Sequence, residues 1–126
     1  MSESTFSVTI ISPEKQIYAG SAEHLLIPGS DGYFGVMANH ASLVAELDYG
    51  ILEVKLNGNT TKIVIDAGFA EIKSNTVKIL TNGGDLQKNI DIDKAKKELE
   101  LALASTSKHR NEEIKKAKFR VEIHKN

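Results

Sequence analysis

Apolar and polar residues alternate through much of the first 84 residues, and alternation is the pattern of a strand with one buried face. In the stretch Phe6-Ser7-Val8-Thr9-Ile10 the apolar residues alternate with hydroxyl-bearing ones, which predicts a strand that ends at Ser12-Pro13. We expect further strands at 16–19 and at 22–27, the second of them closed by Pro28-Gly29.

Two pairs of apolar runs are separated by turn-forming residues and predict β-hairpins. The runs 50–56 and 60–65 flank Asn57-Gly58, and both of these residues tolerate the positive φ of a tight hairpin turn. The runs 67–72 and 76–80 flank a second turn at Lys73-Ser74-Asn75. About eight to ten short strands at this spacing are typical of an antiparallel β-sandwich or a flattened barrel.

After residue 84 the apolar residues recur with the period of a helix. One stripe follows Asp91, which we expect to cap the helix, and consists of Ile92, Ala95, Leu99, Ala102 and Leu103. Ser105-Thr106-Ser107 interrupts the pattern, and a second helix follows with Ile114, Ala117 and Val121 on one face. Each helix is near the ~12–15 residues below which isolated helices are marginal, so the predicted two-helix hairpin needs a surface to lie on.

Composition divides the chain at the same place. All nine Gly and both Pro lie in residues 1–84, which carry 5 basic and 9 acidic side chains. Residues 85–126 carry 11 basic and 8 acidic side chains. We therefore expect a mainly β plus α fold in two parts, a sandwich at 1–84 and a helical hairpin at 85–126, with the boundary near Asn82-Gly83-Gly84.

Composition also excludes several classes of protein. The chain has no Cys, which removes disulfides, thiolate zinc sites and cysteine nucleophiles. A formal net charge of −1 argues against nucleic-acid binding. The first residues are polar and acidic, unlike a signal peptide, and no apolar run approaches the ~18 residues of a membrane span, so we expect an intracellular, soluble chain.

No residue pattern predicts a catalytic or metal site. The segment from Gly29 to Gly35 repeats Gly at every third position, which fits a tight turn better than a phosphate-binding loop. His24 and His40 have no third metal ligand at a suitable spacing, so we interpret them as core or interface residues. The carboxylates spread over different elements without a paired motif are Asp31, Glu46, Asp48, Glu53 and Asp66.

The second predicted helix has a basic face. Its cations are Lys115, Lys116, Lys118, Arg120 and Lys125. Such a face is either simply solvated or docks on an acidic protein surface, where each exposed ion pair contributes little. Nucleic acid is disfavoured as a partner because Glu112, Glu113 and Glu122 share the helix.

Three blocks of the sequence are similar to those of one family. They are Ile11-Ser12-Pro13-Glu14 with Ile17-Tyr18-Ala19-Gly20 behind it, then the run from Pro28 to His40-Ala41, then Asp66-Ala67-Gly68-Phe69-Ala70-Glu71 followed by Val77-Lys78-Ile79-Leu80-Thr81. In these blocks, and in order and length over essentially the whole chain, the sequence resembles the epsilon subunit of bacterial F-type ATP synthase. The chloroplast epsilon and mitochondrial delta subunits are similar.

The resemblance implies a non-catalytic rotor subunit that needs no cofactor and forms no homo-oligomer. In this family the sandwich binds the gamma subunit and sits on the c-ring, while the hairpin either lies on the sandwich or extends along gamma into the alpha/beta hexamer and blocks ATP hydrolysis. The basic residues Lys115, Lys116, Lys118 and Arg120 would then meet the acidic base of the beta subunits. The chain would be a peripheral protein at the cytoplasmic face of a bacterial membrane, held there through the complex.

The resemblance also assigns site residues by position. The ring-facing loop falls on Ser30, Asp31, Gly32 and Tyr33, and the loop histidine near the gamma contact falls on His40. The position of Tyr33 is often Glu in relatives, although an amphipathic Tyr also suits an interface.

Some relatives bind regulatory ATP through an Ile-Asp-x-x-Arg-Ala motif together with Arg residues on the second helix. The corresponding residues here are Ile90, Asp91, Lys94 and Ala95. Lys94 keeps the charge of the Arg but lacks its planar fork. Two interpretations of Asp91 stay open, a part in ATP binding and a plain helix cap.

Two other classes of protein remain as alternatives at this point. One is a free-standing small-ligand or glycan-binding sandwich with an appended helical pair. Exposed aromatic side chains on one sheet face would favour it, yet the chain has no Trp and only seven Phe plus Tyr. A hydrolytic enzyme has no sequence motif in its favour.

Overall fold

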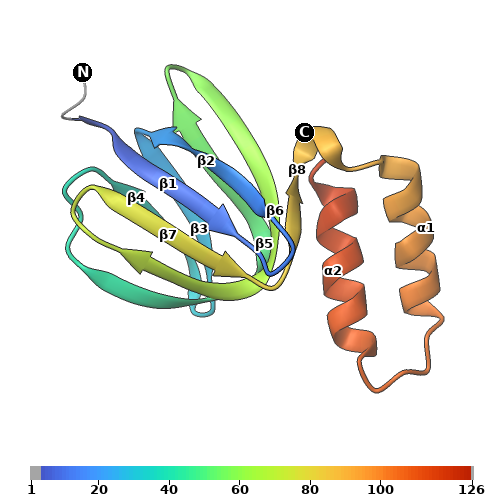
Figure 1. Ribbon diagram of the computed structural model, residues 1–126. Helices are drawn as coiled ribbons and strands as arrows, with labels where there is room; N and C mark the ends of the chain where they lie inside the picture. The colour runs from blue at the N-terminus through green and yellow to red at the C-terminus, as the bar shows by residue number, and fades with distance from the viewer. Residues whose placement is uncertain (1–3, 126) are drawn as a thin grey trace.

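A computed structural model describes residues 4–125 and places a β-sandwich beside a pair of helices (Figure 1). Its strands are β1 (Phe6–Ile11), β2 (Gln16–Ala22), β3 (His24–Gly29), β4 (Gly32–Met37), β5 (Leu43–Leu56), β6 (Asn59–Ile72), β7 (Thr76–Thr81) and β8 (Gly84–Leu86). A 3-10 helix η2 (Gln87–Asn89) leads into α1 (Ile92–Leu103) and α2 (Arg110–Glu122).

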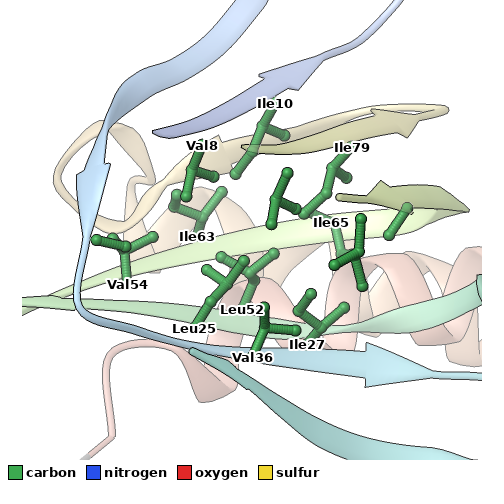
Figure 2. Close-up of a cluster of buried hydrophobic side chains, with 14 of the residues drawn as sticks. Val8, Ile10, Leu25, Ile27, Val36, Leu52, Val54, Ile63, Ile65 and Ile79 are labelled. Carbon is green, nitrogen blue, oxygen red and sulfur yellow. The ribbon is translucent and has the colours of Figure 1, made fainter. Parts of the chain in front are cut away.

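The strands form one sheet that folds back on itself. Their order is β2-β1-β7-β6-β5-β3-β4, and β8 pairs with β6 beside this path. Although β2 lies at one end of the path, it contacts both β5 and β8. Figure 2 shows the resulting core, in which Val8 and Ile10 of β1 face Leu25 of β3 and Leu52 of β5. All four side chains are fully buried, and each such burial stabilises the fold by about 1.5–3 kcal/mol.

The expected fold class is confirmed, and so are both hairpins. Asn57 and Gly58 have φ of 53° and 79° and connect β5 to β6 with Leu56 opposite Asn59. The second hairpin joins β6 to β7, with Ile72 opposite Val77. Gly32, with φ 123°, lies at the turn between β3 and β4, which agrees with the tight turn expected there.

Several details differ from the sequence expectations. β1 and β7 pair in parallel, so the sheet is mixed rather than wholly antiparallel. Pro28-Gly29 continues β3 instead of closing a strand, because Pro28 pairs with Tyr33 of the adjacent β4. β5 and β6 are each 14 residues long, where the sequence predicted shorter strands. The division at residue 84 stays a prediction, and β8 continues the pairing with β6 as far as Leu86.

β6 has an irregular segment at Asp66-Ala67-Gly68. Tyr49 pairs with Asp66 and Leu47 pairs with Gly68, so one residue on each strand, Asp48 and Ala67, is left out of the ladder and the register is kept. Ala67 has φ 65°, a conformation that costs a residue with a side chain about 1–3 kcal/mol. Before this irregular segment β6 pairs with β8, and after it β6 pairs with β7. The irregular segment is therefore the place where one continuous strand changes its neighbour.

The tail forms the expected two-helix hairpin. The Asp91 carboxylate accepts hydrogen bonds from the backbone N–H groups of Asp93 and Lys94, which confirms it as the N-cap of α1. Of the apolar stripe on α1, Ala95 and Ala102 are buried, but Leu103 is 53% exposed at the last turn of the helix. The seam between the helices is thus made largely of alanine and buries little apolar area.

The irregular segment of β6 yields a stability prediction. At Gly68 φ is 138° and an added Cβ would lie 2.0 Å from the Leu80 carbonyl oxygen, so Gly68→Ala forces the backbone to move. We expect the free energy of unfolding to fall by about 3 kcal/mol or more. Urea denaturation of the full chain measures it. The matched control is Gly58→Ala, where φ is 79° and no atom lies within 4 Å, so the expected loss is about 1 kcal/mol. Equal losses in the two variants would contradict this account of the irregular segment.

Candidate functional site

The hairpin is attached to the sandwich by an ion pair between Arg120 of α2 and Asp66 of β6. Arg120 Nη1 donates to Asp66 Oδ1 and Nη2 donates to Oδ2, both at 2.8 Å. The two side chains are only 13% and 6% exposed. Burial by itself lowers the pKa of Arg120, but the hydrogen bonds to Asp66 and its negative charge outweigh burial, and the pKa is raised. The guanidinium therefore stays charged.

The irregular segment of β6 and its neighbours position the Asp66 carboxylate. The Asp66 N–H donates both to the Gly83 carbonyl at 3.0 Å and to Thr81 Oγ1 at 3.1 Å. The Thr81 hydroxyl lies 2.7 Å from the Ala67 carbonyl, to which it donates. Gly83 leaves room for the carboxylate, since a Cβ at this residue would lie 2.8 Å from Asp66 Oδ2. The local sequence thus fixes an acidic side chain at this end of the sandwich.

A few further contacts support the ion pair. Gln87 Nε2 donates to the Ile123 carbonyl at 2.7 Å, and Ile123 is itself buried. His124 Nε2 donates to the Ile90 carbonyl, also at 2.7 Å. Lys115 Nζ lies 3.9 Å from Asp48 Oδ1, with both side chains about half exposed, so this pair contributes little. The ion pair between Arg120 and Asp66 is therefore the main polar contact between the sandwich and the hairpin.

Tyr49 lies beside this attachment on β5. The Lys115 ammonium is 6.0 Å from the centre of its ring. Burial, and then the carboxylates of Asp66, Glu112 and Asp48, raise the pKa of the Tyr49 phenol above its ordinary value of 10.0, whereas Arg120 acts in the opposite direction. The phenol therefore stays neutral at physiological pH.

A polar cavity of about 310 Å³ lies between the sandwich and the hairpin. Its lining includes Ile90, Asp91, Lys94 and Ala95, the whole candidate ATP set. Lys116 and Arg120 of α2 and Asp66 also line it. Lys15, from the turn between β1 and β2, lines the same cavity and forms an ion pair with Asp85 of β8. The structure thus brings the candidate ATP residues together with two cations of the second helix.

The candidate ring-facing residues are not brought together with His40. Ser30, Asp31, Gly32 and Tyr33 lie at the turn where β4 begins, whereas His40 follows the other end of that strand. His40 Nδ1 donates to the Ala41 carbonyl at 2.7 Å. In the same loop the Asn39 N–H bonds the Ser74 carbonyl at 2.8 Å, beside the turn between β6 and β7.

The cations of α2 do not share one environment. Arg120 is largely buried against Asp66, Lys115 leans toward Asp48 and Tyr49, and Lys116 lines the cavity. Lys118 is exposed and stacks 5.3 Å from the centre of the Phe119 ring. Only part of the predicted basic face is therefore open to solvent in this conformation.

The sequence reasoning missed an exposed apolar face on β5, β6 and β7. Val44, Phe69 and Leu80 are 68%, 56% and 52% exposed. Phe69 pairs with Leu80 across the β6–β7 ladder, and Leu80 pairs with Ile11 of β1. Phe69, Leu80 and Ile11 line a hollow of about 510 Å³, and Val44 lies outside it. The available signal was that β6 and β7 carry apolar residues on both faces, with Ala70 and Ile79 pointing to the core.

Comparison with known proteins identifies the family. The model of the ATP synthase Delta/Epsilon chain, beta-sandwich domain, matches residues 5–84. An ATP synthase epsilon chain of Leptospira borgpetersenii is 44% identical over 116 residues, which is 91% of each chain. The chain belongs to the ATP synthase epsilon chain family.

A more distant relative and a solved structure agree with this assignment. An epsilon chain of Prochlorococcus marinus is 35% identical over 108 residues, 86% of this chain and 80% of the relative. A chain in the cryo-EM structure of Euglena gracilis mitochondrial ATP synthase, described as OSCP/F1/c-ring in rotational state 1, superposes with a TM-score of 0.71 at 27% identity and covers 94% of this chain and 76% of that one.

Family membership confirms the main functional interpretation of the sequence. The chain is a non-catalytic, epsilon-type component of the central stalk of F1Fo ATP synthase, and the alternatives of a free-standing binding sandwich and of a hydrolase are set aside. Among residues 4–125 no helix is long and apolar enough to cross a membrane. The same part of the chain contains no cluster of three acidic or histidine side chains arranged to hold a metal ion.

The ion pair yields a prediction about docking. Arg120→Gln leaves Asp66 unpaired while the hairpin is docked, and we expect the docked state to lose about 3 kcal/mol, or more than 100-fold in its population relative to the undocked state. Amide hydrogen exchange of the full chain measures this, with faster exchange in α2 and unchanged protection in β1 and β5.

Two further variants control this experiment. Lys115→Gln removes an exposed cation of the same helix. It should change the free energy of opening of α2, derived from its exchange rates, by less than about 1 kcal/mol. The double variant Asp66→Asn/Arg120→Gln leaves no unpaired charge and should regain part of the loss. If Arg120→Gln exchanged no faster than Lys115→Gln, the pair would not be the main attachment.

Proposed function

We propose that the chain is a two-part rotor subunit in which the sandwich is fixed to the gamma subunit and the membrane c-ring and the hairpin is a movable arm that inhibits ATP hydrolysis. The observation that carries this proposal is the mode of attachment, since one buried ion pair with two hydrogen bonds is the main polar contact between the hairpin and the sandwich. With this kind of attachment the docked and the extended hairpin can differ in free energy by only a few kcal/mol. A difference of this size is roughly what ligand-driven switching requires.

The exposed apolar face supports attachment to gamma. An apolar surface made of Val44, Phe69, Leu80 and Ile11 is typical of a protein interface. The turn Ser30-Asp31-Gly32 with Tyr33 is the proposed contact to the c-ring, and His40 belongs to a separate end of the sandwich. The chain of the Euglena complex that superposes here comes from an assembly described as containing F1 and the c-ring, which agrees with the proposal.

The cations of α2 support the inhibitory part. When the hairpin leaves the sandwich, Arg120 and Lys115 are released from Asp66 and Asp48 and join Lys116 and Lys118 on an exposed basic face. Such a face complements an acidic surface at the base of the alpha/beta hexamer. In this proposal the chain acts as a single copy without nucleic acid, and lies at the cytoplasmic face of a bacterial membrane through the complex.

A truncation in the assembled synthase tests the inhibitory role. Removing residues 90–126 keeps β8 paired with β6 and takes away both helices. We expect ATP hydrolysis to rise several-fold, because the proposed blocking element is gone, and the truncated chain to stay bound to gamma. ATPase assays of the reconstituted complex measure the first, and co-purification with gamma measures the second.

This experiment tests inhibition by the helices and attachment through the sandwich separately. Unchanged hydrolysis with the truncated chain still in the complex would contradict inhibition by the helices. Loss of the truncated chain from a complex that keeps the full-length chain would contradict attachment through the sandwich.

A regulatory nucleotide is a second candidate role for the hairpin, although the rotor function needs no cofactor. The specific observation is that Asp91, Lys94, Lys116 and Arg120 line one cavity, which would place three cations near a polyphosphate. If ATP binds there with a dissociation constant near 1 mM, 5 mM ATP should stabilise the docked hairpin by about 1 kcal/mol.

Hydrogen exchange in α2, measured with and without ATP, tests this proposal. We expect ATP to slow exchange about fivefold in the native chain and to have no effect in Lys94→Ala, which removes one of the cations. No effect of 5 mM ATP on the native chain would rule out ATP as the regulator.

A further inference from the structure

The exposed turn between β3 and β4 is fixed to the neighbouring strand β5 at two points. The Ser30 N–H donates to the Glu46 carbonyl at 2.9 Å. The Tyr33 hydroxyl accepts a hydrogen bond of 3.0 Å from the Ile51 N–H. One contact comes before the tip of the turn and the other after it, so the tip at Asp31 has little freedom to move.

The contact of Tyr33 fills a gap in the β3–β5 ladder. The ladder pairs Leu26 with Glu53 and resumes only where Gly29 pairs with Leu47. Between these pairs β5 has more residues than β3, and Pro28 has no N–H to contribute. The Ile51 N–H lies in this interval, and a backbone donor in a sheet needs an acceptor. The phenol of Tyr33 supplies the acceptor that the ladder does not.

The local sequence makes room for this arrangement. A Cβ at Gly50 would lie 2.6 Å from the Tyr33 hydroxyl oxygen and 2.6 Å from Pro28 Cβ, so only glycine lets the phenol reach across β3 to β5. Tyr33 nevertheless remains 52% exposed. Its ring is therefore fixed at one end and open to a partner over much of its surface.

We propose that Tyr33 is a positioning residue that fixes the turn in its binding conformation and presents a hydrogen-bond donor to the partner. Among residues 4–125 its hydroxyl donates no hydrogen bond, while its oxygen already accepts one from Ile51. The available proton therefore suits an acceptor on the partner, such as a backbone carbonyl or a side-chain amide oxygen of a polar loop, rather than a cation.

The inference rests on the proposed function, in which the partner of this turn is the c-ring. A turn that is already ordered loses less conformational entropy on binding than a mobile one, so the hydroxyl of Tyr33 would raise the affinity both through its donated bond and through preorganisation.

Tyr33→Phe tests the inference, because it removes the hydroxyl and keeps the ring. We expect the Ile51 amide to exchange about three- to tenfold faster in the full chain, as measured by NMR, since its acceptor is gone. We also expect the variant, bound to gamma, to attach to the purified c-ring about three- to tenfold more weakly. Binding to gamma itself should be unchanged.

Tyr18→Phe on β2 is the matched control, since it makes the same chemical change away from the turn. Unchanged exchange at Ile51 in Tyr33→Phe would overturn the positioning role. Faster exchange with unchanged c-ring affinity would overturn the role in recognition. If the native chain with gamma failed to bind the c-ring at all, the proposed function would be wrong, while the exchange measurement would still test what Tyr33 does to the turn.

Discussion

The buried ion pair between Arg120 and Asp66 is the constraint on which the arrangement of the two parts depends. Removing two charges from water costs nearly as much as their attraction returns, so a pair of this kind fixes geometry more than it adds stability. The two parallel hydrogen bonds of 2.8 Å set the angle at which α2 meets the sandwich. The hairpin is consequently well oriented and only weakly held.

The ion pair depends in turn on a strained backbone. Ala67 adopts a positive φ that disfavours alanine, and hydrogen bonds to its carbonyl from the Thr81 hydroxyl and the Asn82 N–H offset the strain. At this irregular segment the Asp66 side chain reaches α2, and β6 pairs with β8 before the segment and with β7 after it. The same few residues therefore shape the sheet and provide the acidic partner of the hairpin.

The sequence predicted the features that arise from neighbouring residues. The turn at Asn57-Gly58 and the cap at Asp91 depend on residues within a few positions, and both are found as expected. Two other features join residues more than fifty positions apart. They are the parallel pairing of β1 with β7 and the ion pair between Asp66 and Arg120. No local pattern encodes such pairings, which explains why Asp66 was interpreted as one of several scattered carboxylates.

Arg120 can engage only one anion at a time with both of its terminal nitrogens. While it is paired with Asp66 its terminal nitrogens are unavailable to an acidic surface on another subunit, so these two interactions exclude one another. A competitor can shift the hairpin only by the difference between its affinities for the docked and the free arm. Because the ion pair contributes little net stability, that difference can be small. A single buried carboxylate on the sandwich thus sets how readily the arm is released.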